Sequence, residues 1–309
     1  MENFLTAVNA VLPTLFILAL GNLCRYLKVL NSTVTNGFNK AIVYIFLPSL
    51  IATNFLKVDL KDLLDGEIFL FAFLGLVAEL LIMTFMGKLL DKDKVRRASV
   101  MVSVINSNCL ILGGSIALSL YGYLPHVVGF LASTISIVSN GFAILIFQTT
   151  QKGRFSFSTV LITLKNPLIA TLLLTLLVRF LNIPIPKFMT TLIENLAGAT
   201  TPVALLCLGV FFYFKGLKKT LCPVLKGIVF RYIFAAIVVW VAVVCGIREE
   251  RLAALIFVFG TSTAISAYPL SIEYGGDSEI VGNSVVISAV TSIFFVALLI
   301  FILKNMGCL

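Results

Sequence analysis

Four hydroxyl side chains and a proline interrupt an apolar part of the chain, the stretch GTSTAISAYPLSIEYGG at 260–276. Pro269 has no backbone N–H group, and in a continuous helix its ring would clash with the carbonyl group of Ile265, four residues earlier. Inside a bilayer, such a break is tolerated only where it is packed in protein or lines a water-filled cavity. The stretch therefore predicts half of a binding site that offers hydrogen bonds to a polar ligand.

A second polar patch lies in another apolar segment, SVINSNCLILGGSIALSLYG at 103–122. Burying the amides of Asn106 and Asn108 without partners would cost about 2–7 kcal/mol each, which favours a role in binding. Gly113 and Gly114 follow in the middle of the segment. Small residues also let membrane helices pack closely, so packing alone is an alternative explanation for the two glycines.

Two interrupted helices that meet at mid-depth would offer unpaired N–H groups and the positive poles of their dipoles to one ligand, which favours an anion such as a carboxylate. Neither segment carries a lysine or arginine near its middle. The anion would therefore be held without a permanent counter-ion. The predicted binding residues are Asn106, Asn108, Gly113, Gly114, Ser115, Thr261, Ser262, Thr263, Ser266, Tyr268 and Pro269.

The composition assigns the chain to the membrane. Of its 309 residues, 60% are hydrophobic and 12% are charged, and the mean hydropathy is +1.08; soluble domains carry about 25% charged residues. Ten apolar segments are each long enough for a tilted transmembrane helix, and they lie at 4–27, 37–56, 68–90, 98–121, 125–148, 159–181, 189–213, 227–246, 251–273 and 280–303. We therefore expect an all-α integral membrane protein with ten transmembrane helices.

The basic residues predict the orientation of the chain. Most of the 23 lysines and arginines fall on the side reached after the odd-numbered spans, a group in which we include Arg231. Cytoplasmic loops carry such an excess, so both termini are predicted to lie outside the cytoplasm in a multi-pass protein of the plasma membrane. Topology and contact with anionic membrane lipid account for the net charge of +9, and no nucleic-acid partner is expected.

A repeat relates the two halves of the chain. The pairs that are separated by the same number of residues are Pro13 with Pro167, Arg25 with Arg179, and Pro48 with Pro202. We therefore expect two repeats, at 1–150 and 151–309. Because each repeat holds five spans, an odd number, the second must enter the membrane inverted, as in secondary transporters whose site lies where broken helices meet at the midplane. Helices four and nine are the broken crossover helices of this arrangement.

Motifs distributed over the second half carry a resemblance to a known family. Asn166-Pro167, Pro202 with Leu205 and Gly209, and Tyr274-Gly275-Gly276-Asp277 resemble the auxin efflux carrier family, which includes plant auxin exporters and bacterial permeases for malate and malonate. The similarity covers essentially all ten segments. It implies a ten-helix carrier of two repeats that moves organic anions through crossover helices four and nine, and it is compatible with a homodimer.

The chain departs from the family's pattern in span four. Ser115 occupies the place of a proline, and Leu110 occupies that of a glycine. We therefore expect the interruption of this helix to be softer, or displaced toward Gly113 and Gly114.

Few other residues offer chemistry inside the spans. Glu79 is the one carboxylate deep in a membrane segment, which makes it a candidate for carrying a proton. A neutral, hydrogen-bonded Glu79 that ties its helix to a neighbour is the alternative. Neither the six cysteines nor His126 has metal-binding spacing, so we expect no metal and no cofactor. An enzyme would need a carboxylate pair, a metal, or a nucleophile with its base, and the spans lack them.

These features together predict a secondary active transporter of small organic anions, mono- or dicarboxylates, that works by alternating access and is driven by protons or by the membrane potential. Two alternatives stay open. One is a sodium-coupled organic-anion symporter that resembles the bile acid symporter family, and the other is a membrane sensor that binds the anion without transporting it.

Overall fold

The computed structural model describes residues 2–57, 66–152, 167–181, 183–211 and 214–309. Within these ranges the chain is helical apart from short connections and one isolated β-bridge, between Ser107 and Thr263. This agrees with the predicted all-α class. Residues 159–166 of the predicted sixth span, 159–181, lie outside the described residues.

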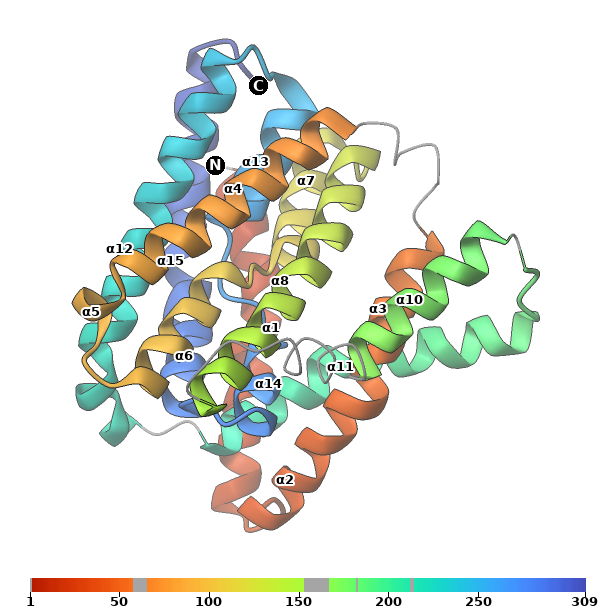
Figure 1. The fold of residues 1–309 in the computed structure, drawn as a ribbon, viewed down its shortest axis with the longest axis vertical. Helices are drawn as coiled ribbons and strands as arrows, with labels where there is room; N and C mark the ends of the chain where they lie inside the picture. The colour runs from red at the N-terminus through yellow and green to blue at the C-terminus, as the bar shows by residue number, and fades with distance from the viewer. Residues whose placement is uncertain (1, 58–65, 153–166, 182, 212–213) are drawn as a thin grey trace.

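The helices follow one another in close succession along the chain (Figure 1). Before the gap at 153–166 they are α1 (Glu2–Tyr26), α2 (Ser32–Ala41), the π-helical turn η1 (Ile42–Phe46), α3 (Leu47–Lys57), α4 (Gly66–Phe85), α5 (Gly87–Leu90), α6 (Lys94–Ile105), the π-helical turn η3 (Cys109–Gly113), α7 (Gly114–Tyr121) and α8 (His126–Lys152). After the gap they are α10 (Pro167–Phe180), α11 (Lys187–Phe211), α12 (Phe214–Val244), α13 (Glu249–Gly260), α14 (Ala267–Glu273) and α15 (Ser278–Asn305).

Five helices of the described part are long and apolar enough to cross a membrane. They are Gly66–Phe85, His126–Gln151, Lys187–Val210, Lys219–Val244 and Ser278–Asn305. Shorter apolar helices lie at Phe16–Tyr26, Cys109–Tyr121 and Pro167–Phe180. The sequence predicted ten spans, and two of these, 98–121 and 251–273, are each built from shorter helices, so helix length alone does not count them.

Large apolar side chains cover the outside of the molecule. Those that are exposed on the outer helices include Phe16, Phe85, Phe180, Trp240 and Phe301. A soluble protein would bury such residues, whereas the hydrocarbon of a bilayer is their favoured surroundings. The structure is therefore that of an integral membrane protein.

The helices pack in two groups. In the first group α1 crosses α11, and α3 packs against both α10 and α11. In the second group α12 packs against α6, α13 and α15, while α8 packs against α6 and α13. In Figure 1, α3, α10 and part of α11 project to the right, away from the second group.

The crossing of α1 with α11 depends on a pair of glycines. A Cβ atom on Gly21 would overlap the carbonyl oxygen of Leu206, and one on Gly209 would overlap the carbonyl oxygen of Leu18. Close approach of two membrane helices through small residues is a common way to pack their backbones directly. This contact leaves no room for a side chain at Gly209, one of the motif residues of the second half.

Arg231 corrects the charge pattern on which the orientation was based. This side chain lies within α12, is 2% exposed and belongs to the interior. It was counted as a loop residue because it stands near the start of the predicted span 227–246. It therefore contributes nothing to the excess of loop charge.

Candidate functional site

The first helix interruption separates α6 from η3. Asn106 ends α6 in an extended conformation (φ −91°, ψ 108°), and Asn108 precedes the first turn of η3 (φ −85°, ψ 40°). Gly113 and Gly114, toward which we expected the break to be displaced, both have helical torsion angles and join η3 to α7 without a gap. The expected displacement is therefore wrong, because the chain breaks at the amide patch.

The second interruption, residues 261–266, separates α13 from α14. Pro269 lies inside α14, in its first turn, so the break precedes the proline that predicted it. The first N–H groups of a helix have no acceptor within the helix, and a proline there removes no hydrogen bond. The carbonyl group of Ile265, which the proline would crowd in a continuous helix, instead accepts a 3.2 Å hydrogen bond from the N–H group of Tyr268.

The two interruptions cross and pair with each other. The N–H group of Asn108 donates to the carbonyl oxygen of Ser262 (2.8 Å), and that of Ala264 donates to the carbonyl oxygen of Asn106 (2.9 Å). These bonds form an antiparallel bridge centred on Ser107 and Thr263. Unwound backbone is tolerated at membrane depth only when its polar groups find partners, and here each segment supplies partners for the other.

Three of the predicted binding residues hold this crossing together. The hydroxyl of Thr261 lies 2.8 Å from that of Ser107 and donates to the carbonyl oxygen of Phe257 (2.7 Å). The hydroxyl of Thr263 donates to the carbonyl oxygen of Ser103 (2.8 Å). Ser262, whose carbonyl accepts from Asn108, is the third. All three residues are almost completely buried, and none of them lines the cavity that forms where the two interruptions meet.

The two half-helices differ in the N–H groups that they offer. In α14 the N–H of Ala267 donates to the carbonyl of Ala264 (3.1 Å), the N–H of Tyr268 is also bonded, and Pro269 has none. This helix therefore does not have the bare amide end that the sequence predicted. The first N–H groups of η3, which begins at Cys109 and continues into α7, lack acceptors within their helix by position.

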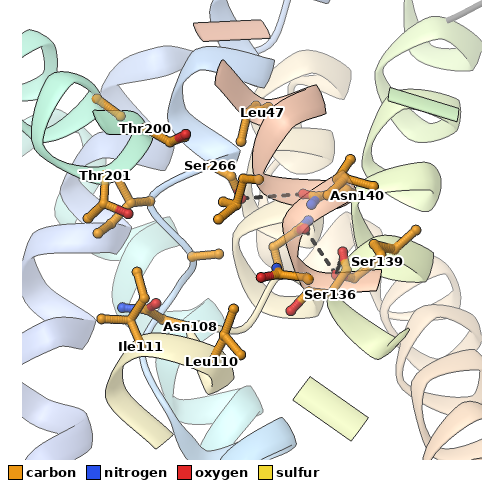
Figure 2. Close-up of a pocket in the computed structure, with 18 of the residues that line it drawn as sticks. Leu47, Asn108, Leu110, Ile111, Ser136, Ser139, Asn140, Thr200, Thr201 and Ser266 are labelled. Carbon is orange, nitrogen blue, oxygen red and sulfur yellow. Dashed lines mark hydrogen bonds between the residues drawn. The ribbon is translucent and has the colours of Figure 1, made fainter. Parts of the chain in front are cut away.

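A cavity of about 80 Å³ lies where the two interruptions meet (Figure 2). It is bounded by η1 and α3, α8, α11 and the two unwound segments. Its polar lining consists of amides and hydroxyls: Asn54, Asn106, Ser107, Asn108, Ser136, Ser139, Asn140, Thr200, Thr201 and Ser266. Within the described part of the chain, no charged side chain lines this cavity.

Hydrogen bonds fix part of this lining in place. The hydroxyl of Ser139 donates to Oδ1 of Asn106 (3.2 Å), and the hydroxyl of Ser266 donates to Oδ1 of Asn140 (3.4 Å). Both contacts are drawn in Figure 2, where Asn108 lies at the cavity beside Leu110 and Ile111. Asn106, Asn108 and Ser266 are thus the predicted binding residues that line the cavity.

The remaining predicted residues lie elsewhere. Gly113 faces α13, because a Cβ atom there would lie 2.6 Å from Cβ of Phe257, so close packing explains this glycine. Ser115 donates to the carbonyl oxygen of Ile111 within its own helix (2.7 Å). Tyr268 is buried, and its hydroxyl has no hydrogen-bond partner among the described residues. Neither these three nor Gly114 and Pro269 line the cavity.

The sequence analysis missed the contributions of three other helices. Ser136, Ser139 and Asn140 lie on α8 with the spacing of one helix face, and this polar stripe in an apolar span was a detectable signal. Thr200 and Thr201 precede the proline of α11 and reach the cavity from the other side. Asn54 on α3 is a single polar residue whose position no local pattern indicates.

Glu79 lies outside the cavity, on α4. It is 2% exposed, and its Oε1 atom has no hydrogen-bond partner among the described residues. Within the described part of the chain, no hydrogen bond from Oε1 of Glu79 therefore ties α4 to a neighbouring helix. In the same part of the chain, no three His, Cys, Asp or Glu side chains come together in a group that could hold a metal ion.

The chain has apolar helices that are long enough to cross a bilayer, and it encloses polar backbone breaks between its helices. These features are those of an integral membrane protein. The family model described as membrane transport protein matches residues 6–164 and 149–300, and the chain therefore belongs to this family, the auxin efflux carrier family that its motifs resemble. A comparison with curated proteins gave no match. Family membership makes the chain a membrane transporter.

Proposed function

We propose that the protein is a secondary active transporter of small organic anions, mono- or dicarboxylates, that works by alternating access and is driven by protons or by the membrane potential. The observation that carries this proposal is the uncharged, hydrogen-bonding cavity at the meeting point of the two helix interruptions. A carrier must release what it binds. A cavity of amides and hydroxyls can hold a carboxylate without the strong attraction of a fixed opposite charge.

The position of η3 favours an anion as the ligand. Asn108 lies at the N-terminal end of η3 and lines the cavity, so a ligand there meets the positive end of the continuous helix from Cys109 to Tyr121. Unpaired N–H groups and the helix dipole both favour negative charge at this end. The side-chain amide groups of Asn106 and Asn140 are the further donors that we assign to the ligand, and the hydroxyl of Ser266 holds Asn140 in place.

The size of the cavity favours a small acid. Sites for drug-sized molecules enclose about 300–1,000 Å³, whereas this cavity encloses about 80 Å³. Apolar side chains, among them Leu47, Ile51 and Ile137, form the rest of its wall. A short carboxylic acid with a small apolar part suits this combination.

The contacts between helices support two inverted repeats, 1–150 and 151–309, with broken crossover helices four and nine among ten spans. In such an arrangement, span one and span six are equivalent, as are spans two and seven. The crossing of α1 with α11 and the packing of α10 on α3 are then equivalent contacts, each between the first span of one repeat and the second span of the other. The cavity lies between the first group of helices, which includes α3 and α11, and the second group, which includes α8. Relative motion of the two groups would therefore expose the cavity to alternate sides of the membrane.

The surroundings of the transporter are part of the proposal. We place it in the plasma membrane with both termini outside the cytoplasm, in contact with membrane lipid and compatible with a homodimer. Glu79 is the proposed proton-coupling residue, because it is a buried carboxyl group inside the membrane region and its Oε1 atom has no hydrogen-bond partner in the part of the chain that the structure describes.

Isotope counterflow tests the proposal. Purified protein in liposomes is preloaded with one unlabelled mono- or dicarboxylate at a time, and entry of the labelled acid is measured. A carrier exchanges the labelled acid for the unlabelled one, whereas a sensor binds it without exchange. Failure of every acid to exchange, with imposed proton gradients and membrane potentials, would refute the proposal.

A further inference from the structure

Arg231 is a buried cation at the centre of the transporter. Its side chain, on α12, is 2% exposed and is among the largest fully buried side chains of the described part. Nε donates to the carbonyl oxygen of Phe259 (3.2 Å), and Nη1 donates to those of Ser103 (3.2 Å) and Asn106 (3.4 Å). The guanidinium group therefore bonds to backbone carbonyls of both interrupted segments.

Those carbonyls belong to the C-terminal ends of two helices. Ser103 and Asn106 lie at the end of α6, and Phe259 lies in the last turn of α13. The last carbonyl groups of a helix lack partners within it and form the negative pole of its dipole. Two negative poles from different helices thus converge on one positive side chain.

Arg231 and the amide-lined cavity occupy different parts of the crossing. Arg231 does not line that cavity; it borders a separate void of about 10 Å³ together with Thr263 and Ser284. A void of this size holds about one water molecule. The positive end of η3 faces the proposed anion, and the negative ends of α6 and α13 face the guanidinium group of Arg231.

The positive charge of Arg231 faces backbone carbonyl groups and one carboxyl group. Among the described residues, no carboxylate forms a salt bridge with Arg231. Glu79 is the acidic group that interacts with it electrostatically. Guanidinium keeps its charge under all ordinary conditions, and its five N–H groups suit several carbonyl acceptors at once.

In transporters built from broken helices, unwound carbonyls and helix C-terminal ends commonly coordinate a transported cation such as sodium. We propose that Arg231 is the resident cation of this crossing and occupies the place of a coupling metal ion, so that the protein binds its anion without sodium. This inference rests on the proposed function for its meaning in transport. The cation assignment itself is tested on protein stability, which requires no transport.

The test removes the side chain of Arg231 and supplies a cation from solution in its place. The variant Arg231→Ala opens a space lined by the same carbonyls, and its thermal unfolding is measured after purification in choline, sodium or guanidinium chloride at equal, millimolar ionic strength. We expect sodium or guanidinium to raise the Tm of this variant by about 3 °C or more relative to choline. Wild type should show no such difference.

Arg25→Ala is the matched control. Arg25 also donates to a backbone carbonyl, that of Val210 (3.2 Å), but it is only partly buried and does not bond to either of the two helix interruptions. Its removal should produce no cation-specific change in Tm. A Tm of Arg231→Ala that is the same in all three salts would overturn the proposal.

Two further variants decide the question if Arg231→Ala cannot be purified. Arg231→Lys keeps the charge and should be folded and indifferent to the choice of salt, whereas Arg231→Met fills the space without charge and should unfold at a lower temperature than Arg231→Lys. A Met variant at least as stable as the Lys variant would show that the charge is not needed.

Transport separates this inference from the proposed function. Wild-type uptake of the anion that needs sodium would refute the resident cation and leave organic-anion transport intact. Conversely, rescue of Arg231→Ala stability by cations in a protein that exchanges no carboxylate would refute the proposed function and leave the resident cation intact.

Discussion

The backbone N–H group of Asn108 donates a 2.8 Å hydrogen bond to the carbonyl oxygen of Ser262, and this bond joins two unwound segments from opposite halves of the chain. With the return bond from Ala264 to Asn106, it satisfies backbone groups that hydrocarbon would leave without partners. The break in each helix is therefore stabilised by the break in the other. The proposed site and its framework depend on this mutual pairing.

The substitution Asn108→Ala should weaken substrate binding about 10- to 100-fold, because it removes a donor to a carboxylate and such charge-assisted bonds contribute about 1.5–3 kcal/mol. The measurement is the concentration dependence of uptake in liposomes. Ser115→Ala is the control, since Ser115 bonds within its own helix and does not line the cavity. Equal affinity in the two variants would count against the cavity as the binding site.

Replacing Pro269 by alanine and replacing Ala264 by proline should have different effects on uptake. Pro269→Ala should preserve uptake, because position 269 lies in the first turn of α14, after the break. Ala264→Pro should abolish uptake, because it removes the N–H group that donates to Asn106. Loss of uptake in the Pro269 variant, with unchanged Tm, would show that the proline itself forms the break.

The contact between α1 and α11 predicts that Gly209→Ala lowers the Tm by several degrees. The added methyl group would overlap backbone atoms of α1, and overpacking of this kind costs about 1–3 kcal/mol or more. Gly198→Ala, on the same helix, meets no atom within 4 Å and serves as the control. Thermal unfolding of the two purified variants makes the comparison, and similar Tm values would contradict the tight crossing.

The hydroxyl pair of Ser107 and Thr261 should show energetic coupling. Their oxygens lie 2.8 Å apart in a buried setting, so each single change to alanine should leave the other hydroxyl with one partner fewer. In a double-mutant cycle, the unfolding free energies should deviate from additivity by about 0.5–1.5 kcal/mol. Strict additivity would indicate that the two hydroxyls do not interact.

Glu79→Gln should remove the response of uptake to an imposed pH gradient while counterflow at equal pH persists. This pattern follows if the carboxyl group carries the coupled proton, since glutamine has the same shape but cannot ionise. Uptake is measured with the pH gradient and with a potential of the same driving force. A variant that still responds to the pH gradient would assign Glu79 a structural role.

The sequence alone determined the class of the protein and the segments that contain the breaks. Apolar composition requires a bilayer, and amides or a proline within an apolar run indicate interrupted helices, because both are local properties of the chain. The polar stripe of Ser136, Ser139 and Asn140 on α8 was also present in the sequence, although its role required knowledge of what lies opposite.

Only the tertiary structure decided where the breaks fall and what each polar residue does. The unwound residues 106–108 are stabilised by partners in 261–266, far away in the chain, so no local propensity could locate them. For the same reason Thr261 and Thr263 became framework residues, whereas Asn108 reached the cavity. Arg231, which local charge patterns assigned to a loop, became a buried partner of two helix ends once long-range packing had brought those ends together.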